Sequence, residues 1–195
     1  MKFHCAADHG FGFDFHPTSQ RHGPDPISPD NAAEGLSYTS SIVLEMTSRL
    51  PKYLAFNLYI DNYYTSVPLL AVLRKNGIGG YGSAPTSSKN FPPDLILSKN
   101  KSSRLLEYHE RAETVVDGVA VMLWMDNAPV SMMATIHQLK GRRCEVLKEW
   151  KRPGLKSSNA GGVKRAKVFS EGEWKVLLNI PKCIDDYSHH MGGLI

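Results

Sequence analysis

The stretch LYIDNYYTSVPLL at residues 58–70 predicts the central unit of the fold. The run YLAFNLYI at 53–60 is short and almost wholly apolar, which is typical of a central strand covered on both faces. After the turn residues, Ser66 can cap a helix with one apolar face, and Gly77 can end that helix in the left-handed conformation. Strand, short loop and capped helix together predict a βα unit of an α/β fold.

Asp61 stands at the carboxyl end of the predicted strand, where open α/β sheets bind their ligands. Aspartate is a poor strand former and is costly to bury without a partner, so it must be solvated, hydrogen-bonded or bound to a metal. In one interpretation its carboxylate accepts hydrogen bonds from the backbone amides of the next turn. In the other it ligates a metal, and the residues alone leave both interpretations open.

Composition indicates one folded domain, because 195 residues with 42% hydrophobic content can bury a sizeable core. The net charge of +4 is compatible with nucleic acid but does not require it. The cysteines Cys5, Cys144 and Cys183 have neither a disulfide pattern nor zinc-site spacing, so reduced thiols are expected. No apolar run approaches the roughly 20 residues of a membrane span, and the first ten residues do not resemble a signal peptide. We therefore expect an intracellular protein without a membrane partner.

The rest of the chain predicts short elements separated by loops, within one domain over residues 1–195. The predicted segments are a hairpin with strands at 2–7 and 11–16, a surface loop at 21–36, a helix at 37–50, irregular chain at 79–104, a hairpin with strands at 119–125 and 130–137, a basic flexible segment at 141–170, and a C-terminal helix that begins near residue 180. No internal repeat is found.

Three stretches occur in an order and spacing that resemble a known family: IDNYYTSVPLL at 60–70, WMDNAPVSMMATIH at 124–137 and IPKCIDDYSHHMGG at 180–193. Together they resemble the catalytic domain of piggyBac-type transposases and their domesticated relatives. The opening KFHCAADHGFGFDFH at 2–16 resembles the early hairpin of that domain. The resemblance covers nearly the whole chain.

This resemblance implies a ribonuclease H-like mixed sheet flanked by helices, with an insertion between the unit that carries the second aspartate and the C-terminal helix. In the family, three aspartates bind two divalent ions for DNA strand cleavage and transfer. Carboxylate oxygens suit Mg²⁺, and two metals can stabilise the attacking and leaving oxygens of an in-line displacement. By its motif DNYYTS, Asp61 matches the second catalytic aspartate, which implies an ancestral catalytic and Mg²⁺-binding role.

The chain departs from the family pattern at the other two aspartates. The family's first aspartate lies on a strand before the early hairpin, and no residue here matches it. The third follows the glycine pair, where MGGLI places Ile195, whose side chain cannot ligate a metal. We therefore expect an incomplete domain from a truncated or decayed transposase, inactive as this chain and without functionally bound Mg²⁺. A fragment of a longer active transposase, and a reused DNA-binding or scaffolding module, are the alternatives.

Four other acidic residues could act as substitute metal ligands: Asp8, Asp14, Asp185 and Asp186. Turns and exposed helix faces explain them without a metal. The pair His189-His190 stands one helical turn after two of these aspartates and can form a metal site, or simply an exposed polar helix end. We favour the simpler interpretation for all of them.

A basic stretch can contact the phosphate backbone of DNA, with Trp150 adding a stacking surface. Its members are Arg142, Arg143, Lys148, Lys151 and Arg152. The alternative is an ordinary solvated insertion, since Glu145 and Glu149 lie within it. The resemblance favours DNA, and it also implies a nuclear location and self-association. The run KRAK at 164–167 is a short match to nuclear-targeting signals.

Overall fold

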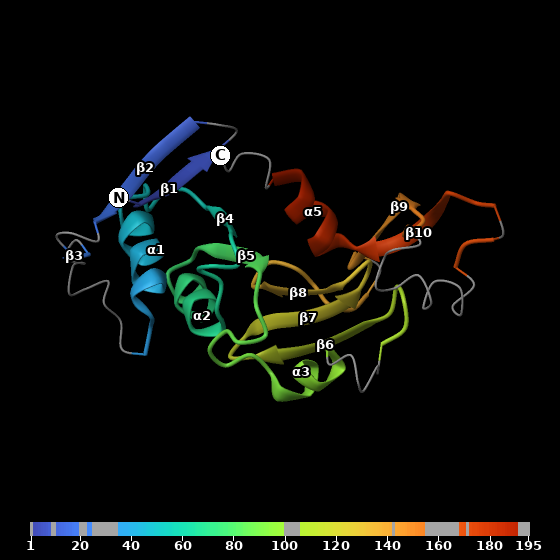
Figure 1. Cartoon of the computed structure of the whole chain (residues 1–195). Coiled ribbons are helices and arrows are strands. Elements are labelled where there is room, and N and C mark those ends of the chain that lie inside the picture. Colours follow the sequence, from blue (N-terminus) through green and yellow to red (C-terminus); the bar gives the residue numbers. More distant parts are fainter. Residues whose placement is uncertain are drawn as a thin grey trace.

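The computed structural model describes residues 2–8, 11–19, 23–24, 35–99, 106–141, 143–154, 168–170 and 172–190 (Figure 1). In chain order the elements are β1 (Lys2–Asp8), β2 (Phe11–Ser19), β3 (Gly23–Pro24), α1 (Tyr38–Ser48), β4 (Asn57–Ile60), α2 (Val67–Lys75), β5 (Gly79–Ser83), α3 (Pro93–Lys99), β6 (Arg111–Val116), β7 (Val119–Met125), β8 (Pro129–Ala134), β9 (Glu145–Lys151), β10 (Lys175–Pro181) and α5 (Lys182–His190).

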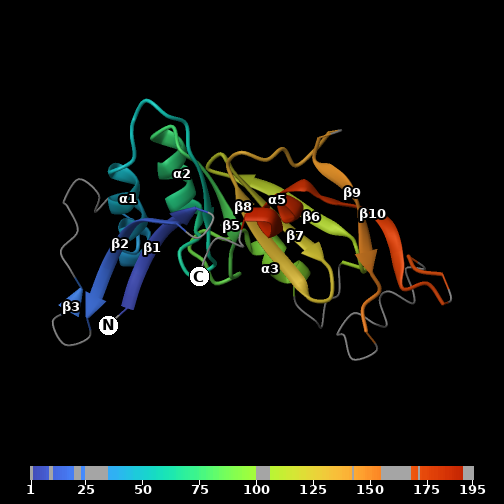
Figure 2. The same cartoon turned by 90° about the horizontal axis from the view of Figure 1, so that it is seen from above.

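The main sheet has five strands in the order β4-β5-β8-β7-β6. Strand β4 runs parallel to β5, and the remaining pairs are antiparallel, which makes the sheet mixed. A three-stranded sheet, β1-β2-β3, lies beside α1, and the hairpin β9–β10 lies at the opposite end of the molecule (Figures 1 and 2). The mixed sheet flanked by helices agrees with the predicted fold class.

Strand β7 is buried along its whole length because helices cover both faces of the main sheet. Val119 and Val121 point to the cluster that contains α2 and α3, whereas Met122 and Trp124 point to the cluster that contains α5. This alternation follows from the two-residue period of a strand. Figure 1 shows α5 above the sheet and α3 below it.

The βα unit forms as the sequence predicts. Ser66 is the N-cap of α2 and its hydroxyl accepts a hydrogen bond from the Leu69 N–H. After the helix, Gly77 takes a φ of 74°, a conformation in which a side chain would be strained. The hairpin of β1 and β2, the helix α1 and the hairpin of β7 and β8 also lie where the sequence predicts them.

Strand β4 differs from its prediction. It is an edge strand of the main sheet, paired with β5 alone within the described residues, instead of a central strand covered on both sides. Tyr53 and Leu54 are exposed and precede the strand, so part of the apolar run is loop. An apolar run is buried only where neighbouring elements of the fold cover it. In this run they cover Ile60, which is buried.

The prediction of irregular chain at 79–104 is wrong, because β5 and α3 lie within it. The sequence of β5, GGYGS, has few residues that favour strands, and its glycines instead allow close packing. A Cβ atom added to Gly82 would lie 2.0 Å from the Ile60 carbonyl oxygen. The contact with β4, which the local sequence does not reveal, selects glycine here.

The prediction of a basic flexible segment at 141–170 is wrong for Glu145–Lys151, which form β9. Within this segment, the described chain does not include residue 142 or residues 155–167. It also leaves out most of the predicted loop at 21–36. Ile180, expected on the C-terminal helix, is the buried penultimate residue of β10. Cys144 and Cys183 are buried free thiols, and burial raises the pKa of Cys183 to about 12.

Among the described residues, no helix is long and apolar enough to span a bilayer.

Candidate functional site

Asp61 follows directly after β4 and is half-buried at the carboxyl end of that strand. Its side-chain Oδ1 accepts a hydrogen bond from the Tyr63 N–H at 2.9 Å, and its backbone carbonyl accepts from the N–H groups of Tyr64 and Thr65. The hydrogen bond predicted between the Asp61 carboxylate and a backbone amide of the next turn is therefore present. Within the described chain, no hydrogen bond to the other carboxylate oxygen, Oδ2, is found.

Two hydroxyl groups fix the backbone around Asp61. The buried Thr65 donates to the carbonyl oxygens of Asp61 at 2.9 Å and Ile60 at 3.2 Å. The Tyr187 hydroxyl, from α5, lies 3.4 Å from the Ile60 carbonyl and 3.2 Å from the Ser83 hydroxyl. Helix α5 is thereby held against the ends of both β4 and β5. Burial raises the pKa of Tyr187, and the nearby Asp61 charge adds to this shift.

The aspartates of α5 are committed to other partners. Asp185 forms an ion pair with Lys148, and Asp186 lies 2.9 Å from the Nε2 atom of His137. Asp14 pairs with Arg49 at 2.8 Å. Searched over the described residues, the structure holds no group of three or more histidine, cysteine, aspartate or glutamate side chains that could hold a metal. Among the described residues, the donors near Asp61 thus fit one ligand of a divalent cation site.

The basic stretch is divided between the two faces of β9, which alternate along the strand. Lys148 points inward to Asp185, and Trp150 also points inward, where its Nε1 donates to the Asp126 carboxylate at 3.0 Å. Trp150 packs edge-on against Trp124 at 5.5 Å. The predicted stacking surface at Trp150 is therefore wrong, because the indole is part of the packing between the hairpin and the main sheet.

The other basic residues lie at the ends of β9. Arg143 and Lys151 are exposed, while Arg152 is half-buried and its guanidinium lies 3.4 Å from the Ser170 carbonyl oxygen. Arg142 lies outside the described chain. Trp174, which precedes β10, is 76% exposed. The sequence identified these charges but predicted flexible chain for them, and only the folded strand shows which of them face solvent.

Sequence reasoning missed the roles of Tyr187 and Thr65 beside Asp61. The helical pattern placed Tyr187 on the apolar face of the C-terminal helix, which gave no signal that its hydroxyl reaches the end of β4. Thr65 lay between the turn and the cap residue Ser66, and its burial could not be read from that position.

The profile of a transposase family, Transposase IS4, matches residues 1–194. The chain belongs to this IS4 transposase family. Transposases of this DDE type depend on metal ions in general. A search of curated proteins found no significant match.

Among solved structures, this transposase-family chain is similar to a cryo-EM structure described as the piggyBac transposase synaptic complex with hairpin DNA. The TM-score is 0.56 at 12% sequence identity, and the match covers 97% of this chain but 31% of that chain. The likeness confirms the fold predicted from the sequence motifs, that of a piggyBac-like transposase. This protein is therefore transposase-derived, and it spans about a third of the length of the piggyBac transposase chain.

Proposed function

We propose that Asp61 is a retained carboxylate of a DDE-type metal site and that this chain by itself does not complete the site. The observation that supports this most directly is the half-buried carboxylate of Asp61 at the end of β4, in a member of a metal-dependent transposase family. Thr65 and Tyr187 position the carbonyl groups beside this carboxylate. When two Mg²⁺ ions are bound in such a site, they stabilise the attacking and leaving oxygens of strand transfer.

The described residues favour an inactive site in this chain alone. Asp185 and Asp186 are paired with Lys148 and His137, so that recruiting them would break existing contacts. Other ligands would have to come from residues outside the described chain or from a second chain. We therefore expect no Mg²⁺-dependent nicking of supercoiled DNA, measured by gel electrophoresis. Reproducible nicking that disappears in Asp61→Asn would instead support the alternative, an active transposase.

Asp61→Asn separates a metal ligand from a turn residue. The asparagine oxygen can still accept the Tyr63 N–H, so the turn is preserved while the negative charge is lost. In wild type we expect Mn²⁺, used in place of Mg²⁺, to broaden the NMR signals of the amides at 62–65 preferentially. The variant should need at least about tenfold more Mn²⁺ for the same broadening, as metal-site substitutions commonly cost this much.

The matched control is Asp117→Asn, on the turn between β6 and β7. Asp117 is exposed with a φ of 51°, a conformation that asparagine also tolerates. Its own neighbouring amides report how an isolated exposed carboxylate responds to Mn²⁺. If the amides after Asp61 broaden no earlier than those near Asp117, the carboxylate serves the turn alone.

We also propose that the exposed ends of β9 contact DNA phosphates, in a protein that acts in the nucleus and self-associates. Among the described members of the basic stretch, Arg143 and Lys151 are exposed, and the protein similar in fold was solved with hairpin DNA. Lys148 is left out of this proposal because it is paired with Asp185.

Lys151→Gln should weaken DNA binding and flatten its salt dependence. Each phosphate contact contributes about 0.9 to the slope of log affinity against log salt, so we expect the slope to fall by about this amount. Fluorescence anisotropy with duplex DNA between low and moderate salt measures it. The control, Lys52→Gln, alters an exposed lysine on the loop before β4. A wild-type response that does not change with salt would favour a scaffolding module without DNA.

A further inference from the structure

A pocket of about 210 Å³ lies where three loops meet, and one of them is the turn that follows Asp61. Two of these loops, at 62–66 and 85–89, follow the parallel strands β4 and β5 at their carboxyl ends. The third leads into α1. Open α/β sheets bind their ligands at such strand ends. Since sites for drug-sized ligands measure about 300–1,000 Å³, this pocket suits a single small group.

Most of the polar side chains that line this pocket carry hydroxyl groups. Four of them form a chain, in which the Ser37 oxygen lies 2.9 Å from that of Thr39 and 3.0 Å from that of Ser40. The Ser40 oxygen lies 3.5 Å from that of Ser66. Each hydroxyl has one hydrogen to donate, and the three contacts of the chain use three of the four hydrogens. One hydrogen is therefore left for an acceptor in the pocket.

Lys89 brings a positive charge to the pocket. Its side chain is exposed, and its ammonium group donates to the Gly35 carbonyl at 2.5 Å, which holds the charge beside the loop before α1. An ammonium group has three donors, so two remain for a ligand. Ser87, two residues earlier, is also exposed, and its hydroxyl makes no hydrogen bond to the described residues. Among the described lining residues no side chain is acidic, and Asp61 is not one of them. The accessible groups thus favour an anionic acceptor.

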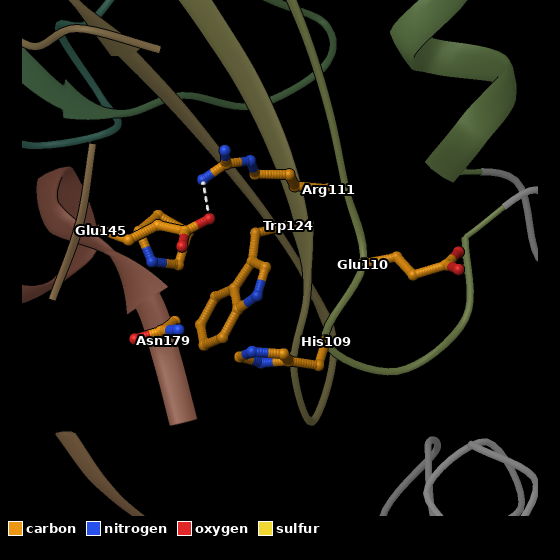
Figure 3. A pocket seen from close by; sticks show the side chains of 7 residues that line it. His109, Glu110, Arg111, Trp124, Glu145 and Asn179 are labelled. Carbon is orange, nitrogen blue, oxygen red and sulfur yellow. Dashed lines mark ion pairs between the residues drawn. The ribbon is translucent and has the colours of Figure 1, made fainter. Parts of the chain in front are cut away.

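A larger cavity of about 540 Å³, between the main sheet and the hairpin β9–β10, differs in this respect (Figure 3). The Arg111 guanidinium that lines it lies 3.0 Å from Glu145 and 3.3 Å from Glu113. Burial lowers the pKa of His109, so its ring is neutral near pH 7. An anion in that cavity would meet no uncommitted cation among the described lining residues. The pocket at Lys89 therefore favours an anion, and the larger cavity does not.

We propose that the pocket at Lys89 binds a phosphate group. A phosphate group is small and anionic, and its oxygens accept hydrogen bonds, which matches one lysine and several hydroxyl donors. Lysine binds phosphate as a point charge, and serine, threonine and tyrosine hydroxyls are common contacts of DNA phosphates. The phosphate can belong to a DNA strand or to a small phosphorylated molecule. A strand bound at Asp61 would pass the pocket, because the turn at 62–66 belongs to both. The inference deepens the proposed function, and only the DNA source rests on it.

Inorganic phosphate tests the pocket itself, when it is titrated at constant ionic strength and without divalent metal. In ¹⁵N–¹H NMR spectra we expect the amide signals at 37–40, 63–66 and 87–89 to shift saturably. The signals around Lys75, the last residue of α2, should stay in place. The proposal is overturned if no saturable shift is seen, or if the signals around Lys75 shift alike. Asp61→Asn should bind phosphate at least as tightly as wild type, so this result does not depend on a metal at Asp61.

Lys89→Gln and Ser87→Ala test the two kinds of donor without disturbing the core, because both side chains are exposed. We expect each variant to bind inorganic phosphate about fivefold more weakly, the effect of losing one hydrogen bond. The matched control, Lys75→Gln, removes the same charge from the exposed far end of α2 and should bind as wild type does. Equal losses in Lys89→Gln and Lys75→Gln would contradict the proposal, since they would show a general effect of charge. Unchanged affinity in Lys89→Gln would contradict it as well.

Duplex DNA identifies the source of the phosphate. If it is a DNA phosphate, Lys89→Gln should lower the slope of log affinity against log salt by about 0.9. This loss should add to that of Lys151→Gln, because β9 lies far from α1 in Figure 1. If inorganic phosphate binds but the slope for DNA stays unchanged, the pocket binds a small phosphorylated molecule. A lower slope for DNA without saturable binding of inorganic phosphate would make Lys89 an isolated surface contact and overturn the pocket.

Discussion

Replacement of Gly82 by alanine is expected to destabilise the protein by roughly 3 kcal/mol or more, at the upper end of overpacking costs. The new Cβ would lie 2.0 Å from the Ile60 carbonyl oxygen and 2.6 Å from the Thr65 hydroxyl oxygen. The first of these is a backbone atom of the neighbouring strand, which cannot move without breaking the pairing of β4 with β5. Urea denaturation followed by circular dichroism measures the loss as a lower midpoint.

The consequence reaches the candidate metal site, because Ile60 immediately precedes Asp61. A displaced β4 would also disturb the contacts of Thr65 and Tyr187 with the Ile60 carbonyl. The control is Gly154→Ala, where an added Cβ meets no atom of the described residues within 4 Å. A variant at Gly82 that is as stable as this control would show that β4 and β5 are not as closely packed as described.

Leu70→Ala is expected to reduce the free energy of unfolding by about 2–5 kcal/mol, the usual cost of truncating a buried leucine. Leu70 is 0% exposed on the inner face of α2 and belongs to the core cluster under the sheet. Leu70 packs directly on the backbone of Gly80, because a Cβ atom built on Gly80 would lie only 2.8 Å from a Leu70 methyl group. Gly80 therefore has no side chain that could fill the space left by Leu70. The removed methyl groups would therefore leave a cavity.

The same substitution on the hairpin provides the comparison. Leu177 on β10 is 63% exposed, so Leu177→Ala should change the stability by no more than about 0.5 kcal/mol. Both variants are measured by urea denaturation, with an unchanged denaturant slope indicating that the unfolding reaction is the same. Equal losses for the two variants would contradict the assignment of α2 to the core.

Local signals in the sequence were enough for the elements that depend on near neighbours in the chain. The Ser66 cap and the Gly77 stop bound α2 because capping uses backbone groups within a few residues. The apolar run of β7 and its turn were likewise predictable, since a strand buried on both faces needs no polar alternation. The position of Asp61 after β4 follows from the same local pattern.

Strand β5 was not predictable in this way. Its glycines are unfavourable in an isolated strand, and they are explained only by the approach of the Ile60 carbonyl to Gly82. Strand β9 was not predictable either, because its charged residues are typical of solvated chain. Its place in the fold depends on the contacts of Lys148 with Asp185 and of Trp150 with Asp126. These contacts join residues 37 and 24 positions apart.

By itself the sequence determined the transposase family, the βα unit and the place of Asp61 at the end of its strand, since these rest on motifs and on contacts between near neighbours. Only the tertiary structure decided which basic residues face solvent and that Tyr187 reaches the end of β4. The same holds for the pocket that brings Lys89 together with Ser37 and Ser66. Burial and partnership arise between segments far apart in the chain, and no local pattern encodes them.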